Sequence, residues 1–132
     1  MIRKAISLTV LMFLLAGCQT LSERKQSDDL LEVLRNYEAA IRWNSLEQAS
    51  RFTQPDMNGP ATAATPHDLR VTHYEVVQGP SMVSKDTALQ TAVIQYVFED
   101  SQVVHELIDQ QTWRYDREAE HWYLASPLPT FK

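Results

Sequence analysis

The chain has 132 residues, with 12 Lys and Arg against 17 Asp and Glu, and its formal charge is −5. This length predicts a single small domain, and the lone cysteine excludes an intramolecular disulfide. The acidic balance argues against binding to nucleic acid, whose phosphates require clustered Lys and Arg, and against electrostatic adsorption to anionic lipid.

Residues 1–17 have the three regions of a secretory signal peptide. Arg3 and Lys4 give a cationic start, residues 5–15 are mostly apolar, and two small residues follow. The apolar stretch is too short to cross the about 30 Å of a bilayer's hydrocarbon as a helix. We therefore expect residues 1–17 to direct export and to be removed.

The end of this segment, Leu15-Ala16-Gly17-Cys18, resembles the lipobox of bacterial lipoproteins. The resemblance implies a diacylglycerol thioether on Cys18, cleavage before it, and acylation of the new N-terminus, for example with palmitate. Several acyl chains anchor a protein stably in a membrane. In the family's sorting pattern an Asp after the cysteine retains the protein in the inner membrane. Gln19 at this position implies the outer membrane, facing the periplasm.

Residues 18–26 are mostly polar and are interpreted as the lipidated Cys and a tether, followed by one domain at 27–132. Ser27, before two acidic residues, is the expected N-cap of a helix that runs to about Trp43, with Asn44 closing it. Its apolar face has helical spacing. The members of this face are Leu30, Leu34, Tyr37 and Ile41, widened by Leu31 and Ala40.

A second, shorter helix is expected directly afterwards. Ser45 and Gln48 have the spacing of a capping box, and Leu46, Ala49 and Phe52 form a short apolar face. Residues 53–67 contain three prolines and a glycine and fit no periodic element. Such a segment is either a mobile connector or a lid or binding loop.

The rest of the chain predicts four strands joined by short turns. We expect strands at 69–77, 88–98, 103–115 and 122–125, with turns at Gly79-Pro80, at 99–102 and at 116–121. Pro127 and Pro129 prevent regular continuation. The predicted fold class is α+β, with a helical pair packed on a four-stranded antiparallel meander.

The strand at 88–98 is apolar on both faces. Ala92, Ile94, Tyr96 and Phe98 lie on one face, and Val93 and Val97 lie on the other. Helices can cover only one face. We expect the other to be covered by a second copy of the chain, as a homodimer, or by the tail 128–131.

This order of elements, with Tyr37, Ile41, Leu46 and Phe52 as apolar positions, is similar to the nuclear transport factor 2-like (SnoaL-like) superfamily of cystatin-like folds. The resemblance implies a curved sheet wrapped as a cone around the N-terminal helix, often in a dimer. Members include isomerases, dehydratases, hydrolases and non-catalytic scaffolds. The resemblance therefore implies a possible pocket without fixing a reaction.

Asp109, His105 and His73 are the candidate catalytic residues. The resemblance implies a carboxylate in an apolar cone as the general base, and Asp109 is the best-placed acid. His105 shares its strand face, but the two Cα atoms are about 13 Å apart along a strand. They could line one pocket without hydrogen bonding to each other as a base and its orienting acid.

Other chemistry is not indicated. No Cys, His or acid cluster, His67 and His73 included, has metal-ligand spacing, and there is no glycine-rich phosphate loop, so we expect neither metal nor cofactor. Trp113 and Trp122 could pair across strands. The function we expect is a membrane-anchored envelope lipoprotein with a non-catalytic protein-binding or scaffold domain. The alternative is a small-molecule-binding or catalytic, isomerase- or dehydratase-like pocket with Asp109 as base.

Overall fold

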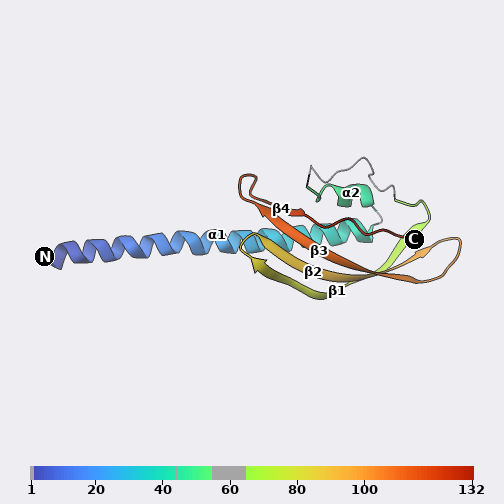
Figure 1. Ribbon diagram of the computed structural model, residues 1–132, viewed down its shortest axis with the longest axis horizontal. Coiled ribbons are helices and arrows are strands. Elements are labelled where there is room, and N and C mark those ends of the chain that lie inside the picture. The colour runs from blue at the N-terminus through green and yellow to red at the C-terminus, as the bar shows by residue number, and fades with distance from the viewer. Residues whose placement is uncertain (1, 44, 55–64) are drawn as a thin grey trace. The chain divides into compact units, whose positions relative to one another are not determined.

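The structure, a computed structural model, describes residues 2–43, 45–54 and 65–132, with side chains from Thr20 onward. Two helices precede four strands (Figure 1). Their bounds are α1 (Ile2–Arg42), α2 (Leu46–Ser50), β1 (Leu69–Ser84), β2 (Thr87–Phe98), β3 (His105–Asp116) and β4 (His121–Leu124). The chain divides into two units, Met1–Glu32 and Val33–Lys132.

The first unit belongs almost entirely to α1, whose backbone is already helical long before residue 27. The expected helix start at Ser27 is therefore wrong. Residues 19–26 include Glu, Arg, Lys and Gln, which are good helix formers, and contain no Pro or Gly to interrupt the helix. The side chain of Cys18 lies outside the described residues. Within the described part, no helix is both long and apolar enough to cross a membrane.

In the second unit, the last turns of α1 pack against the sheet through the predicted apolar face. Leu34, Tyr37, Ala40 and Ile41 are all buried, which confirms the helical phase read from the sequence. Leu31, expected to widen that face, is instead 44% exposed. Val33, which was not assigned to the face, is buried, so the face widens on the side of Ala40 and not on the side of Leu31.

Helix α2 begins as its capping residue predicts. The Ser45 hydroxyl accepts a hydrogen bond from the Gln48 backbone N–H at 3.2 Å, and Leu46 and Ala49 are buried. The backbone N–H of Leu124 donates to the carbonyl of Phe52 at 2.7 Å, which attaches the end of this segment to β4. Asn44, the expected terminator of the first helix, and most of the irregular segment 53–67 lie outside the described residues.

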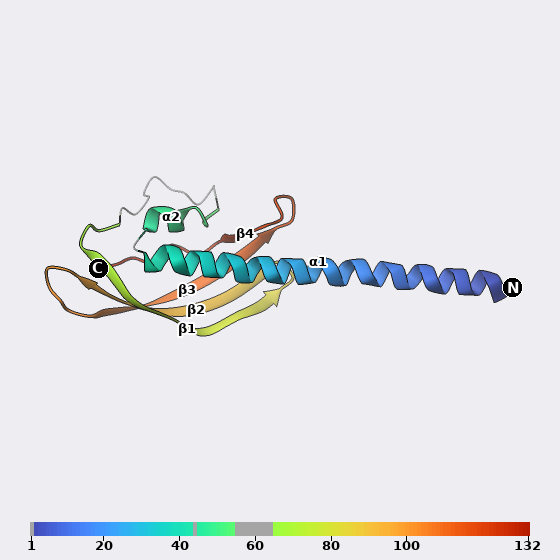
Figure 2. The ribbon, with the colours of Figure 1, turned by 180° about the vertical axis from the view of Figure 1, so that it is seen from behind.

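The four strands form the predicted antiparallel meander in the order β1-β2-β3-β4. Figure 2 shows this sheet lying along the C-terminal part of α1, so the fold is α+β with a helix packed on a sheet. Strand β1 does not end at Gly79-Pro80 as expected. It continues to Ser84 through a cis bond and several register shifts, because an edge strand tolerates a proline that lacks a backbone donor.

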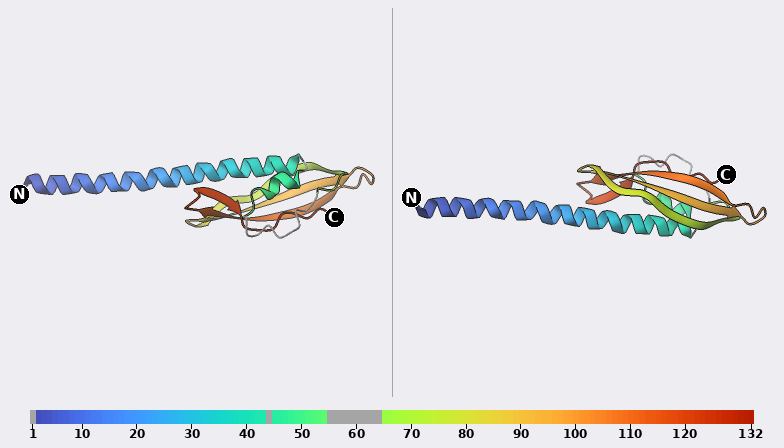
Figure 3. Two further views of the ribbon diagram at one scale, coloured as in Figure 1. Left: turned by 90° about the horizontal axis from the view of Figure 1, so that it is seen from above. Right: turned by 90° about the horizontal axis from the view of Figure 1, so that it is seen from below.

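Gly79 fits this edge because its backbone φ is +98°, and an added Cβ would lie 2.6 Å from the carbonyl oxygen of Leu89. Figure 3 shows the curved strands of the sheet from above and from below.

The sheet has two faces, named here inner and outer. The inner face carries Ala88, Gln90, Ala92, Ile94 and Tyr96 of β2, and their β3 partners Trp113, Gln111, Asp109, Leu107 and His105. It faces the last turns of α1. The outer face carries Leu89, Thr91, Val93, Gln95 and Val97, paired on β3 with Thr112, Gln110, Ile108 and Glu106 where partners exist. The division of β2 into two faces is as predicted.

The C-terminal tail lies over the inner face, not the outer one. The Tyr96 hydroxyl donates to the Lys132 carbonyl at 3.0 Å, and the rings of Tyr96 and Phe131 meet edge to face at 4.9 Å. Ile108 on the outer face is 66% exposed. The expectation that the tail could cover the outer face is therefore wrong, because Tyr96 captures the tail on the opposite face.

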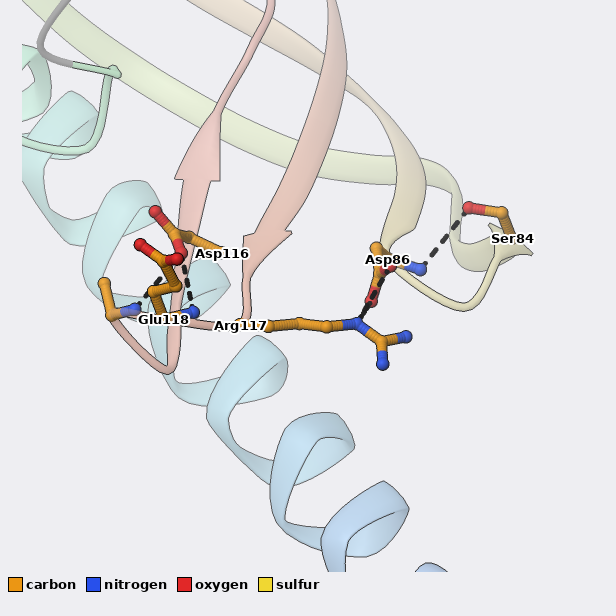
Figure 4. Close-up of polar contacts among 6 residues, drawn as sticks. Ser84, Asp86, Asp116, Arg117 and Glu118 are labelled. Carbon is orange, nitrogen blue, oxygen red and sulfur yellow. Dashed lines mark hydrogen bonds and ion pairs between the residues drawn. The ribbon is translucent and has the colours of Figure 1, made fainter.

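The two hairpin turns at one end of the sheet are joined by polar contacts (Figure 4). Arg117, after β3, donates through Nε to both carboxylate oxygens of Asp86, at 3.1 and 3.2 Å. Asp116 accepts the backbone N–H groups of Glu118 and Ala119, which closes its own turn. The ion pair is exposed, so it aligns the hairpins without adding much stability.

Candidate functional site

Asp109 occupies the centre of the inner face, opposite Ala92, and is only 4% exposed. Its Oδ2 atom accepts two hydrogen bonds, from the Tyr37 hydroxyl at 3.3 Å and from Gln111 Nε2 at 2.8 Å. Tyr37 comes from α1, so this contact joins the helix to the sheet. A general base must lie within hydrogen-bond reach of its substrate, and at Oδ2 that reach is already occupied by Tyr37 and Gln111.

Gln111 is the hub of the buried polar groups. Its Nε2 donates to Asp109 and to the Tyr74 hydroxyl, both at 2.8 Å. Its Oε1 accepts from Gln90 Nε2 at 3.2 Å and from Trp113 Nε1 at 3.1 Å. An amide offers two donor hydrogens and two acceptor lone pairs, so every hydrogen-bonding position of Gln111 is used.

The orientation of the Gln111 amide follows from its neighbours. An indole N–H can only donate and an ionised carboxylate can only accept, so the amide oxygen must face Trp113 and the amide nitrogen must face Asp109. We call Tyr37, Tyr74, Gln90, Asp109, Gln111 and Trp113 the Asp109 network. Within the described residues, no buried side-chain nitrogen or oxygen lacks a hydrogen-bond partner.

The charge of Asp109 is not balanced by a cation. None of the ion pairs between described residues includes Asp109. Burial raises the pKa of its carboxyl, and the hydrogen bonds from Gln111 and Tyr37 oppose that rise because they stabilise the ionised form. Burial outweighs the two hydrogen bonds, so the folded protein favours the neutral acid more than the unfolded chain does.

The two tyrosines of the network stay protonated. Burial raises the pKa of Tyr37 well above its ordinary value, and the negative charge of Asp109 adds to this effect. Burial likewise raises the pKa of Tyr74 to about 12, against the hydrogen bond from Gln111. Tyr37 therefore remains a hydrogen-bond donor to Asp109 at any physiological pH.

The structure places the other two candidate catalytic residues away from Asp109. His105 shares the inner face, as predicted, but it stacks on Tyr96 at 5.2 Å and contacts Phe98 edge to face at 5.6 Å. His73 lies on the outer-face side, opposite Gln95, and pairs with Glu75 at 3.6 Å. Neither histidine joins the Asp109 network, so among the described residues Asp109 is not paired with a histidine.

Trp113 and Trp122, which could pair across strands, are not directly opposite each other. Trp113 lies opposite Leu124 and contacts the ring of Tyr37 at 5.3 Å, whereas Trp122 lies opposite Tyr115 at 5.2 Å between rings. The register of β3 with β4 sets these partners. Both tryptophans are fully buried core residues.

Gln90 and Gln111 were not predicted as site residues, although the sequence around both contains a signal. Each stands at an inward position of a strand whose neighbouring inward residues are apolar or aromatic, in Ala88-x-Gln90-x-Ala92 and in Asp109-x-Gln111-x-Trp113. Polar residues at successive inward positions of two adjacent strands predict a buried hydrogen-bonded pair, because buried polar groups require partners.

Two hollows flank Trp43, which follows the last residue of α1 and is 82% exposed. The larger, of about 270 Å³, lies between α1 and α2, with Arg51 and Phe52 in its wall. The smaller, of about 150 Å³, is bounded by Arg42 and by residues 71–73 of β1. Asp109 lines neither of them.

Among the described residues, no group of three or more His, Cys, Asp or Glu side chains is arranged to hold a metal ion. Comparison with protein-family models, with curated proteins and with solved structures gave no match to this chain. The function must therefore be argued from its own residues.

Proposed function

We propose that this protein is a membrane-anchored envelope lipoprotein whose folded part is a non-catalytic protein-binding or scaffold domain. The anchoring part rests on the signal-like residues 1–17 and on the lipobox-like sequence that ends at Cys18. The observation that carries the binding part is the buried Asp109 network, in which protein groups already bond to Oδ2 of Asp109. The best candidate base is buried, and the groups that reach its accepting oxygen are the protein's own Tyr37 and Gln111.

A nuclear transport factor 2-like domain is the finer fold that we propose. Its support is the order of elements: a helix, a short helix and a four-stranded meander whose inner face receives Tyr37 of α1. In this interpretation the cone is filled by the side chains of the Asp109 network. A filled cone suits a scaffold that binds partners on its surface.

Anchoring is tested by expression in a bacterium that processes lipoproteins, with mass measurement of the N-terminal peptide. The wild-type peptide should begin at Cys18 and carry the added mass of acyl groups, and Cys18→Ser should lose both the added mass and stable membrane association. Ser22→Ala is the matched control and should be processed normally. An unmodified wild-type peptide would contradict the proposal.

Sorting is tested separately by separation of the two membranes. The wild-type protein should be found with the outer membrane, and Gln19→Asp should move it to the inner membrane without loss of acylation. Identical distributions of the two proteins would remove the argument from Gln19.

One observation favours the alternative, a catalytic or small-molecule-binding pocket. A buried carboxyl with a raised pKa is characteristic of general acid–base residues. A thermal-shift screen of small carbonyl compounds tests this alternative. A compound that stabilises the wild-type protein but not Asp109→Asn would favour the pocket over the scaffold.

A further inference from the structure

We infer that the surface around Trp43 is a docking site for an acidic peptide segment that carries an aromatic or large aliphatic side chain. We call this surface the Trp43 ridge, made of Trp43 with its two flanking hollows and the cations Arg42 and Arg51. This inference deepens the proposed binding function and names the class of partner.

Trp43 differs from the other tryptophans of the chain in its exposure to solvent. The chain has 3 tryptophans; Trp113 and Trp122 are fully buried, whereas Trp43 is 82% exposed. Single exposed apolar residues are common in proteins, and exposure alone identifies no site. Tryptophan is, however, the residue most enriched at the energetic centres of protein interfaces, where it is surrounded by contacts that exclude water.

The surface has a hollow on each side of Trp43. Trp43 belongs to the wall of both hollows, so it stands between them as a ridge. Volumes of about 270 and 150 Å³ lie below the roughly 300–1,000 Å³ typical of small-molecule pockets. Each hollow suits single side chains. A peptide that crosses the indole can place one side chain on either side of it.

The lining of the two hollows carries cationic side chains. The larger hollow contains Arg51 and the smaller contains Arg42, while neither has an Asp or Glu in its lining. His73 of the smaller hollow already pairs with Glu75 at 3.6 Å. Arg42 forms an ion pair with Glu38 at 2.9 Å and donates a hydrogen bond to the Tyr74 carbonyl at 3.4 Å. Arg51 forms no ion pair within the described part of the chain and is exposed, so it is the cation available to a partner.

Because the net charge of the chain is negative, the position of Arg51 determines where an acidic partner can bind. A chain with a formal charge of −5 repels an acidic segment over most of its surface. Local complementarity at the Trp43 ridge then determines where and in which orientation such a segment binds. The carboxylate of the peptide reaches Arg51, and its apolar side chain packs beside the Trp43 indole.

The test uses the full chain in detergent micelles and fluorescein-labelled peptides. The probe is Glu-Glu-Phe-Glu-Glu-amide, and the controls are Lys-Lys-Phe-Lys-Lys-amide and Glu-Glu-Gly-Glu-Glu-amide. Fluorescence anisotropy should show saturable binding of the acidic aromatic probe, weaker binding of the glycine peptide, and none of the basic peptide. Salt should weaken the binding because Arg51 and the peptide carboxylates are exposed.

Variants locate the binding. Trp43→Ala should weaken it by about 30-fold or more, and Arg51→Glu by about tenfold. Matched controls are Ile108→Ala, an exposed apolar residue of the outer face, and Arg114→Glu, an exposed cation of β3, and neither should change the affinity. Unchanged emission from the buried Trp113 and Trp122 and an unchanged unfolding midpoint show that each variant is folded.

Acrylamide quenching gives an independent readout, since Trp43 is the accessible tryptophan and the acidic probe should protect it. Equal affinity for the basic peptide, or wild-type affinity in Trp43→Ala or Arg51→Glu, would overturn the inference. So would a dimer of the full chain that Trp43→Ala dissociates, because the ridge would then bind a second copy. Lipid attachment at Cys18 is measured separately, so failure here leaves the anchoring proposal intact.

Discussion

The Tyr37 hydroxyl of α1 donates a hydrogen bond to the Asp109 carboxylate of β3, at 3.3 Å and across 72 residues of sequence. This contact connects the buried face of the helix to the centre of the sheet. It also brings a carboxylate into the core, and no ion pair between described residues includes that carboxylate. Burying a charge without a counter-charge costs free energy, so this relationship makes the stability of the domain sensitive to Asp109.

Asp109→Asn is expected to stabilise the domain at neutral pH, on the order of 1 kcal/mol, because it removes a buried charge and keeps an oxygen that can accept from Tyr37 and Gln111. Urea unfolding at pH 7 followed by circular dichroism measures the change. Glu106→Gln, an exposed acid on the outer face, is the control and should be nearly neutral. A less stable Asp109→Asn would show that the ionised carboxylate itself supports the fold.

The pH dependence follows from the same carboxyl. The pKa of Asp109 is raised in the folded protein, so over the interval between its unfolded and folded pKa the folded state binds more protons. Stability must then fall as pH rises through that interval, starting from the unfolded value near 4. Unfolding midpoints in the acidic range should show this decline in the wild-type protein and a smaller one in Asp109→Asn. Parallel curves would contradict the assignment to Asp109.

Gln111→Ala is expected to destabilise the domain by about 3 kcal/mol or more. The substitution removes the amide to which four buried side chains are hydrogen-bonded: Asp109, Tyr74, Gln90 and Trp113. Gln110→Ala is a matched control, because Gln110 is the same residue type in the preceding position of the same strand and is exposed. Chemical unfolding compares the two. Equal effects would mean that water replaces the amide without cost.

Leu34→Ala is expected to cost on the order of 2–5 kcal/mol, because the leucine is buried in the last turns of α1 and its loss leaves a cavity. Leu31→Ala, in the same helix but 44% exposed, should cost far less. The two unfolding free energies are compared under identical conditions. If Leu34→Ala lowers the unfolding free energy by less than about 0.5 kcal/mol, Leu34 does not lie on the buried face of α1.

A homodimer through the outer face of the sheet remains a prediction. Ile108 is 66% exposed opposite Val93, and the tail lies on the other face. Apolar surface of this kind favours pairing about a two-fold axis. Light scattering on residues 19–132 should give twice the monomer mass, and Ile108→Lys should lower it. A monomer mass for the wild-type residues would contradict this interface.

The elements that depend on local pattern could be predicted from the amino-acid sequence. The spacing of Leu34, Tyr37 and Ile41 predicted the buried helix face, because a helix repeats every 3.6 residues whatever it packs against. Ser45 predicted the start of α2 through its own hydroxyl. The two-residue alternation in β2 predicted its inner and outer faces, and short polar turns predicted the meander.

Contacts between residues far apart in the sequence could be seen only in the folded chain. Asp109 and Tyr37 were both visible in the sequence, but their hydrogen bond depends on where the helix crosses the sheet. The tail had two possible faces, and the Tyr96 hydroxyl fixed it on the inner one. Gln111 became a hub only because Tyr74, Gln90 and Trp113 converge on it from three strands. Local propensity acts over a few residues. These contacts form only in the packed chain, because polar groups that have lost their contact with water must form hydrogen bonds with one another.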